Sequence, residues 1–307
     1  MSIHHLSLRD LGYVCAVAEH LNFSRAADAK AITQPAMSER IRHSEEVLGC
    51  LLFERNKRRV LVTPKGKDIV ALARSILDTA DAIDGLAHAQ EQPLSGTLRL
   101  GVIATLGPYL IPHLLRPLAT QYPNLELHLT EGLTEQLLDT LTSGGLDLVL
   151  AAQPVERDGV RSQDLFFEPF YLAAPKGHSI SINTPVATRT LNADDMILLH
   201  EGHCLSGQAL DACPTKRSSG VERLQATGLE TLRHMIASGS RYSLLPALAV
   251  GKRPPMKALI DYVPLADHRV GRRIAVCWRN SYRQLGNVQA LADTIRTSVP
   301  NSVEHLG

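Results

Sequence analysis

An unbroken helical pattern divides this chain of 307 residues into two parts. From Lys67 to about Gln90, apolar side chains recur every three or four positions over more than three heptads, with no proline and one glycine, Gly85. The apolar positions are Ile69, Leu72, Ala73, Ile76, Leu77, Ala80, Ile83, Leu86 and Ala87. Neither part offers this helix an evident partner, so we expect it to pair with its copy in a second chain. Packing against its own domain is the alternative.

The composition fits a folded protein of two or more domains. Hydrophobic residues make up 44% and charged residues 21%, which excludes a largely disordered or fibrous chain and a small disulfide scaffold. No apolar run approaches the roughly 18 to 20 residues that a bilayer span needs, and the first residues show no basic segment followed by an apolar one. We therefore expect a cytoplasmic protein with no membrane partner.

The first 66 residues are expected to form three short helices. The first carries its apolar stripe at Leu8, Leu11, Val14, Cys15 and Ala18. Ser24 is a candidate N-cap for the second helix, and Thr33 for a third helix with Pro35 in its first turn. Three helices with a tight turn before the third are typical of a helix-turn-helix.

A basic turn follows the third helix. The segment 51–64 is expected to form two short strands around Arg55, Lys57, Arg58 and Arg59. Such a run alone would more often be a solvated loop, but next to the helix pattern it predicts a wing. Residues 1–66 hold ten Lys or Arg against seven Asp or Glu, although the whole chain carries a net charge of only +1. Near neutrality of the whole chain therefore does not exclude DNA binding.

Several motifs in this region resemble one family of regulators. They are Phe23-Ser24-Arg25-Ala26-Ala27, Thr33-Gln34-Pro35-Ala36-Met37-Ser38, Ile41, Glu45, Leu48-Gly49, Leu52-Phe53-Glu54-Arg55 and Thr63-Pro64-Lys65-Gly66. Together they resemble the winged helix-turn-helix of LysR-type transcriptional regulators. The resemblance implies a partner, double-stranded promoter DNA, and two groups of contacts. The major groove would meet Thr33, Gln34, Pro35, Ser38 and Arg42, and the DNA backbone would meet Arg55, Lys57 and Arg58.

The second part alternates strands and helices, which predicts an α/β fold with a mostly parallel sheet. Two such α/β lobes joined by crossover strands resemble the effector-binding region of the same regulators, which is similar to periplasmic binding proteins. The expected domains are a winged helix-turn-helix at 1–66, a dimerising linker helix at 67–92, lobe I at 93–167 and 279–307, and lobe II at 168–278. A cleft between two such lobes usually holds a ligand.

Two of the five cysteines stand in a distinctive segment. Cys204 follows a predicted strand and is expected near a helix N-terminus, where the helix dipole and an adjacent imidazole favour a thiolate. If residues 204–213 were helical throughout, the Cα atoms of Cys204 and Cys213 would lie roughly 13 Å apart. A disulfide needs about 7 Å or less, so linking the two would require unwinding. Zinc binding with His200 and His203 is an alternative, and Cys15, Cys50 and Cys277 are expected to be core residues.

Further motifs resemble the hydrogen peroxide-sensing members of the LysR family. These are Gly202-His203-Cys204-Leu205, Gln208-Ala209, Cys213, 105–112, 229–233 and 244–250. The resemblance implies that Cys204 reacts with peroxide and that Cys213 resolves the product into a disulfide. It further implies a pocket of Thr105, Thr134, His203 and Arg279, although both threonines could simply cap helices. It implies no cofactor or metal, a homodimer or homotetramer, contact with RNA polymerase, and a thiol reductant such as glutaredoxin or thioredoxin.

Ser206 and Gly207 depart from this pattern, because many relatives carry an Arg-Asp pair there. Loss of the carboxylate puts a proton relay in doubt, and Gly207 weakens a helix by up to about 1 kcal/mol relative to Ala. Two other functions remain open. One is a LysR-type regulator that binds a small organic effector between its lobes, and the other is an enzyme, a thiol peroxidase, which the basic wing argues against.

Overall fold

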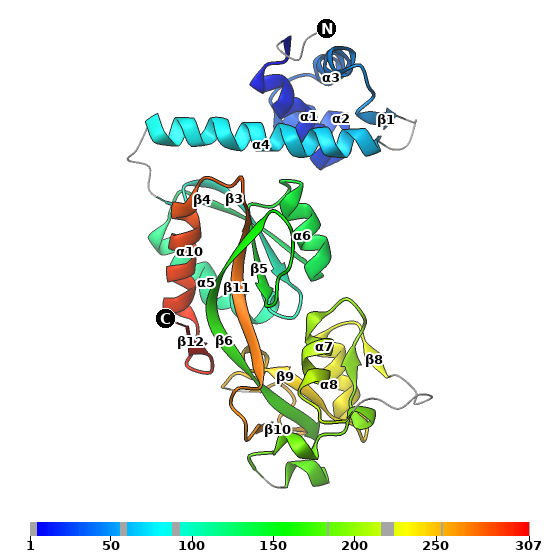
Figure 1. Ribbon diagram of the computed structural model, residues 1–307, viewed down its shortest axis with the longest axis vertical. Coiled ribbons are helices and arrows are strands. Elements are labelled where there is room, and N and C mark those ends of the chain that lie inside the picture. The colour runs from blue at the N-terminus through cyan, green and yellow to red at the C-terminus, as the bar shows by residue number, and fades with distance from the viewer. Residues whose placement is uncertain are drawn as a thin grey trace. The chain divides into compact units, whose positions relative to one another are not determined.

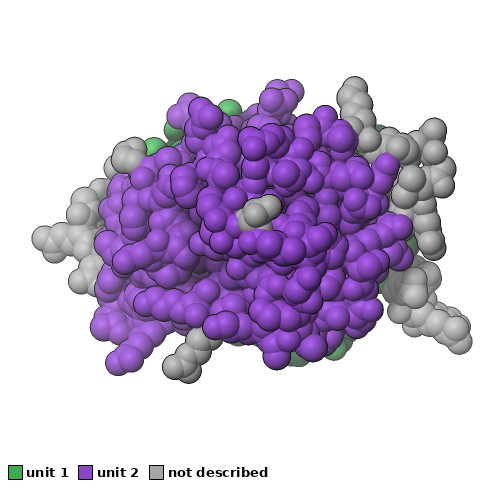
Figure 2. Space-filling model, turned by 90° about the horizontal axis from the view of Figure 1, so that it is seen from below, with its two compact units in different colours: residues 1–92, 139–147, 278–285 green, residues 93–138, 148–277, 286–307 purple. Residues whose placement is uncertain are grey.

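The computed structural model describes residues 5–55, 60–87, 93–182, 184–215, 224–252 and 254–306. The chain forms two compact units, shown in green and purple in Figure 2. Unit 1 contains residues 1–92, 139–147 and 278–285, and unit 2 contains 93–138, 148–277 and 286–307. None of the described helices combines the length and the apolar character that crossing a bilayer demands.

Unit 1 begins with the expected three helices and wing. The helices are α1 (Leu8–His20), α2 (Phe23–Ala29) and α3 (Gln34–Leu48). Strands β1 (Phe53–Arg55) and β2 (Val60–Val62) then pair antiparallel, and α4 (Pro64–Ala87) is the expected long helix. The winged helix-turn-helix and the linker helix are thus confirmed as elements, and the expected last turn of the linker, 88–90, falls outside the described residues.

Two local expectations in this region were wrong. The buried residues of α1 are Asp10, Tyr13, Val14, Ala16 and Val17, whereas Leu8 is 50% exposed and Cys15 is only half buried. The N-terminus of the helix is fixed by Ser7 and Asp10, each of which caps the backbone amide of the other. Helix α2 starts two residues earlier than expected, because the side chain of Asn22, not Ser24, accepts from the first free amides.

The wing is attached to α3 by a buried carboxylate. Glu45 is 8% exposed, and its Oε1 accepts hydrogen bonds from the backbone amides of Leu52 at 2.9 Å and Phe53 at 3.1 Å. Both amides are buried and precede or begin the first wing strand, so without Glu45 they would lack these bonds. The recognition helix thereby fixes where the wing begins.

The start of α4 explains the motif Thr63-Pro64-Lys65-Gly66. The hydroxyl of Thr63 donates to the Leu51 carbonyl at 2.8 Å and accepts from the Gly66 amide at 2.9 Å. A Cβ atom on Gly66 would lie 2.3 Å from the carbonyl oxygen of Leu52, which is closer than any side chain tolerates. Glycine is required there because α4 packs directly on the backbone that leads into the wing.

Unit 2 is built on a mixed sheet with strand order β10-β6-β11-β5-β3-β4. Strand β3 (Gly96–Ile103) pairs in parallel with both β4 (Leu125–Gly132) and β5 (Leu148–Ala152). The connecting helices are α5 (Gly107–Gln121) and α6 (Thr134–Thr142). The α/β class is confirmed, but the sheet is less parallel than expected, because β5 pairs antiparallel with β11 (Gly271–Arg279).

The long strand β6 (Val160–Pro175) serves both lobes. Its first part pairs with β12 (Glu304–His305) at Phe166 and Phe167, and its second part pairs with β9 (Ser243–Pro246) and β10 (Ile260–Pro264). Strands β6 and β11 run side by side (Figure 1). The change of sheet falls between Phe167 and Phe170, next to the lobe boundary that the sequence predicts.

The remaining elements of lobe II surround its apolar core. They are η2 (Ser179–Ser181), η3 (Thr188–Thr190), η4 (Ala193–Asp195), β7 (Leu198–Leu199), α7 (Cys204–Asp211), β8 (Gln225–Ala226), α8 (Leu229–Ser238) and α9 (Ala247–Val250). The last helix, α10 (Leu285–Ser298), contacts lobe I through Arg296, which donates to the Asp164 carbonyl, and through Thr294, which donates to Gln121. This agrees with the expected return of the final helix.

The Glu45 contact generates the first prediction. Replacing Glu45 with Ala leaves two buried amides without these acceptors, which costs about 1–3 kcal/mol. We expect the amides of Leu52 and Phe53 to exchange hydrogen faster and binding to promoter DNA to weaken, as measured by hydrogen exchange and by DNA titration. Glu46→Ala is the matched control, because Glu46 is adjacent and exposed. Unchanged exchange at both amides in Glu45→Ala would contradict the assignment.

Candidate functional site

The polar face of α3 has the chemistry that DNA recognition needs. Thr33 caps the helix by accepting from the Ala36 amide at 3.4 Å, and Pro35 lies in the first turn. Gln34 and Arg42 are exposed, and Ser38 is half buried between them. The Gln34 amide donates to the Ser38 hydroxyl at 3.0 Å. One helical face thus presents an amide, a hydroxyl and a guanidinium, which are suited to base edges and phosphates.

The wing residues are placed less completely. Arg55 is the last residue of β1, and nothing is described of its side chain. Lys57 and Arg58 lie outside the described residues. Their predicted contacts with the DNA backbone stay a prediction.

In unit 2, two predicted site residues lie at the carboxyl ends of neighbouring parallel strands. Thr105 follows β3, and Thr134 follows β4 and is the first residue of α6. The amide of Ala104 donates to the Gly132 carbonyl at 3.0 Å, which holds the two strand ends together. Ligands of α/β sheets bind outside the carboxyl ends of the strands, so this edge is the candidate site.

A buried arginine holds Thr105. Arg272 is 2% exposed, and it donates to the Thr105 hydroxyl oxygen at 2.8 Å and to the Thr105 carbonyl at 3.0 Å. Its Nε donates to Glu168 at 2.8 Å, and the other oxygen of Glu168 accepts from the Leu248 amide, also at 2.8 Å. Thr105 does not cap α5, whose N-cap is Leu106. The hydroxyl accepts from Arg272, so its own proton remains available to another acceptor.

The prediction that Arg279 belongs to this pocket was wrong. Arg272 and Arg279 stand at opposite ends of β11, about 23 Å apart at the rise of a strand. Arg279 belongs to unit 1, where it pairs with Asp78 and donates to the Leu146 carbonyl at 2.7 Å. The sequence offers several arginines in this strand, and only the hydrogen bond to Thr105 singles out Arg272.

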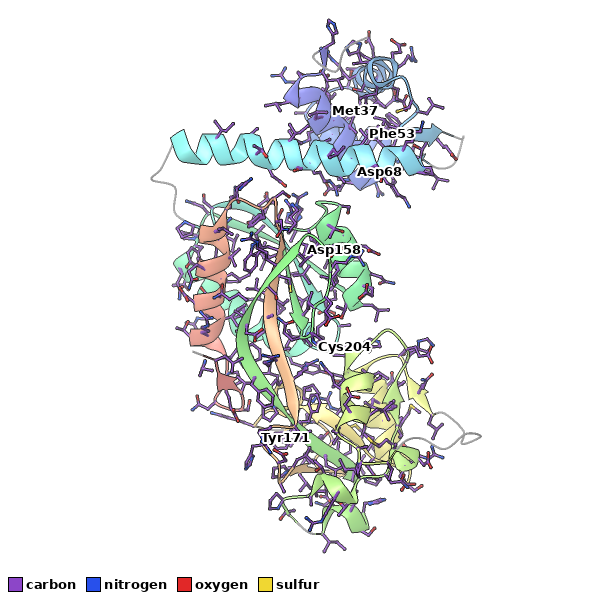
Figure 3. All side chains as sticks on the ribbon, viewed as in Figure 1. Met37, Phe53, Asp68, Asp158, Tyr171 and Cys204 are labelled. Carbon is purple, nitrogen blue, oxygen red and sulfur yellow. The ribbon has the colours of Figure 1, made fainter. Side chains whose placement is uncertain are left out.

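Cys204 is the first residue of α7, and Figure 3 shows it at that end of the helix. It is half buried and unlinked. The turn before it contains Gly202 at φ +102°, where an added Cβ would lie 3.0 Å from Leu133, the neighbour of Thr134. The cysteine helix therefore begins next to the loop between β4 and α6. Ser206 fixes its first turn by donating to the Leu199 carbonyl at 2.7 Å.

His203 occupies the N-cap position of α7 without a side-chain capping bond. Burial lowers its pKa below the usual value, the charge of His200 lowers it further, and a hydrogen bond with the Thr227 backbone acts in the opposite direction. These surroundings therefore favour the neutral form of the ring. In that form His203 can exchange hydrogen bonds with its neighbours, but it does not supply the positive charge that an imidazolium would give Cys204.

Gln208 belongs to one of the motifs named above, but the sequence gives its side chain no role. It lies one helical turn after Cys204, and its amide donates to the carbonyl of Gln153, the residue after β5, at 3.1 Å. Its Oε1 is buried and has no hydrogen-bond partner among the residues that the structure describes. The spacing of four residues from Cys204 is the signal that indicates a shared helical face.

Cys213 lies beyond the end of α7 and is also unlinked. Its thiol packs beside the apolar core of lobe II, and burial raises its pKa from 9.0 to about 11. At neutral pH it is a protonated, protected thiol. Cys277 is fully buried in β11 with a pKa of about 12, which fits its expected core role.

Neither the zinc alternative nor the small organic effector alternative gains support from the described residues. Among the residues described, no three His, Cys, Asp or Glu side chains are grouped to hold a metal ion, so the zinc hypothesis lacks a ligand cluster. An open hollow of about 380 Å³ lies elsewhere in lobe II, lined by Ala187, Thr188, Arg189, Ala266, Asp267 and Arg269. No predicted site residue lines that hollow.

Two family models match the chain. Residues 8–67 match the bacterial regulatory helix-turn-helix of the lysR family, and residues 91–300 match the LysR substrate binding domain. The chain belongs to the LysR family of regulators. Membership of the LysR family confirms a DNA-binding transcription regulator with a two-lobed regulatory domain, rather than an enzyme.

Individual LysR-family relatives narrow the resemblance. The chain is 38% identical to a hydrogen peroxide-inducible genes activator of Pectobacterium carotovorum over 98% of this chain and 99% of the relative. It is also 38% identical to the dual regulator OxyR of Escherichia coli, over 95% of each. A full-length OxyR variant from Pseudomonas aeruginosa has a similar structure, with a TM-score of 0.86 and 36% identity over 96% of this chain and 99% of that one. A Corynebacterium glutamicum OxyR mutant with bound hydrogen peroxide gives a TM-score of 0.65 and 29% identity over 95% and 94%.

The raised pKa of Cys213 predicts how stability depends on pH. The unfolded thiol releases its proton near pH 9, whereas the folded thiol keeps it to about pH 11. The contribution of the buried Cys213 thiol to the free energy of unfolding is therefore complete below pH 9 and is lost as pH rises through 11. Under reducing conditions, Cys213→Ala should make the free energy of unfolding fall less steeply between pH 9 and 11, measured by urea unfolding. An equally steep fall in the variant would contradict the assignment.

Proposed function

We propose that this chain is a transcription regulator that senses hydrogen peroxide through Cys204 and Cys213. The carrying observation is Cys204, half buried at the first residue of α7, two residues after the close approach of Gly202 to Leu133 at the end of β4, with a second free thiol nine residues later. Relatives similar over nearly the whole chain are named hydrogen peroxide-inducible activators, which supports the same signal here.

The proposed chemistry has two balanced steps. The Cys204 thiolate attacks one oxygen of hydrogen peroxide, the O–O bond breaks, and with one proton the second oxygen leaves as water. The product is a Cys204 sulfenic acid. The Cys213 sulfur then attacks this sulfur, an S–S bond forms, and the hydroxyl leaves with the thiol proton as a second water. A dithiol reductant of the glutaredoxin or thioredoxin type restores both thiols.

The pocket contributes hydrogen bonds to the first step. Because Arg272 occupies an acceptor position of the Thr105 hydroxyl, that hydroxyl is oriented to donate its proton to a peroxide oxygen. Thr134 and His203 lie on the flanking elements, and the buried Oε1 of Gln208 offers an acceptor. We propose Arg272 in place of Arg279 as the cation of this pocket.

Helix α7 separates the two steps. While Cys204–Asp211 is helical, nine residues place the two cysteines on the order of 13 Å apart, beyond the reach of a disulfide. Disulfide formation therefore requires the helix to unwind and Cys213 to leave the lobe II core. The altered fold of this segment is the proposed signal to promoter-bound DNA and RNA polymerase.

The linker helix supports assembly as a homodimer, or as a homotetramer of two dimers. Leu72, Ile76 and Ile83 of α4 are 66%, 43% and 65% exposed, and they lie on the apolar positions of the predicted dimerising stripe. A second copy of α4 has the matching stripe and would cover them. Two linked winged domains match a two-fold operator. A reducing compartment such as the cytoplasm keeps the sensor in its thiol form.

The central test replaces Cys204 with Ser. One equivalent of hydrogen peroxide should link Cys204 to Cys213 in the wild type, as seen by mass spectrometry of the digested protein, and should change output from a target promoter. Cys204→Ser should show neither effect. Cys15→Ser is the matched control and should behave as the wild type. Absence of both the link and any Cys204 oxidation in the wild type would refute the proposal.

Gly207 offers a second test, aimed at the unwinding step. The residue is exposed, and an added Cβ would meet nothing within 4 Å, so Gly207→Ala strengthens α7 without a clash. We expect the sulfenic acid to form at the wild-type rate and the disulfide to form up to about 5-fold more slowly. Stopped reactions analysed by mass spectrometry separate the two rates. A disulfide step that is not slowed would show that unwinding does not limit it.

A further inference from the structure

A methionine holds the second cysteine in its reduced position. The Sγ of Cys213 lies 3.1 Å from the Sδ of Met196, and it is also 3.6 Å from the Ala209 carbonyl oxygen, in reach of the same S–H. Met196 is fully buried in the lobe II core. A thioether sulfur is a weak acceptor, so this contact opposes the departure of the protonated thiol.

The segment 192–196, which contains Met196, also forms hydrogen bonds with the turn that follows Cys213. The hydroxyl of Thr215 accepts from the Ala193 amide at 3.1 Å and donates to Asn192 Oδ1 at 3.3 Å. Tyr242 fixes Asn192 in turn, because its hydroxyl accepts from the Asn192 amide at 2.6 Å and donates to the Asn192 carbonyl at 3.1 Å. Residues 192–196 therefore form a seat for the turn at 213–215, anchored in the lobe.

We propose that Met196 is a positioning residue that sets the rate of the disulfide step by retaining Cys213 in this seat. The inference rests on the proposed function. It assigns Met196 no contact with peroxide or with Cys204, so the first oxidation is independent of it. Release of Cys213 from Met196 precedes attack on the Cys204 sulfenic acid, and a tighter seat lengthens the life of that acid.

In a long-lived Cys204 sulfenic acid, further oxidation competes with disulfide formation. A second hydrogen peroxide converts it to the sulfinic acid, with one oxygen added to sulfur and one water released, and this form does not return to a thiol with ordinary reductants. The seat therefore determines how Cys204 divides between a reversible disulfide and an irreversible product when peroxide is abundant.

The test is Met196→Leu, which keeps an apolar side chain of similar size but removes the sulfur acceptor. After one equivalent of hydrogen peroxide, reactions are stopped with a maleimide, and mass spectrometry follows the sulfenic acid, trapped by a dimedone probe, and the disulfide. We expect an unchanged rate of sulfenic acid formation and about 2- to 5-fold faster disulfide formation. At tenfold excess peroxide, the sulfinic fraction should fall.

Two further variants keep the inference open to refutation. Met235→Leu is the control, because Met235 packs on the same core and should leave both rates unchanged. Thr215→Val loosens the other side of the seat from an exposed position, and it should also accelerate the disulfide step. Disulfide rates at or below the wild-type value in both Met196→Leu and Thr215→Val would overturn the role of the seat. Wild-type protein without Cys204 oxidation would instead refute the proposed function.

Discussion

The ion pair between Arg272 and Glu168 joins the parts of the regulatory half that form the candidate site. Both side chains are fully buried, and the two residues come from the crossover strands β11 and β6. Arg272 contacts the loop after β3 through Thr105, and Glu168 contacts the short helix α9 through Leu248. Removal of one partner leaves the other charge buried and unpaired, a loss of about 3–5 kcal/mol in comparable pairs. The position of Thr105 at the carboxyl end of β3 thus depends on the charges of Arg272 and Glu168, which are buried away from solvent.

Much of this architecture follows from pattern in the sequence. The spacing of apolar residues predicts α3, α4 and the strands and helices of lobe I, because each of these elements carries a regular apolar pattern. The motif residues Glu45, Thr63 and Gly66 have local physical reasons, a buried carboxylate under two amides and a close backbone approach. Such requirements depend on few neighbouring residues, so the residues that meet them can be recognised as short motifs in the sequence.

Two of the errors arise from contacts between distant segments, whereas the misplaced stripe of α1 is a local error, because two apolar stripes one residue apart look similar in sequence. Arg272 and Arg279 occupy equivalent-looking places in one strand, and the choice depends on Thr105, which lies 167 residues away from Arg272. The antiparallel pairing of β5 with β11 likewise follows from a strand that returns late in the chain. Periodicity carries no information about such partners.

The residues that pack around α7 differ from the residues proposed to react with the oxidant. Gly207, Met196 and Thr215 take no part in bond making, yet each contributes to how firmly the reduced segment is held. Under the proposed mechanism, a substitution at any of them changes the rate of the disulfide step while Cys204 and its pocket stay intact. The proposed mechanism therefore allows the dose of oxidant that gives half-maximal output to be set by packing residues, without a change at Cys204.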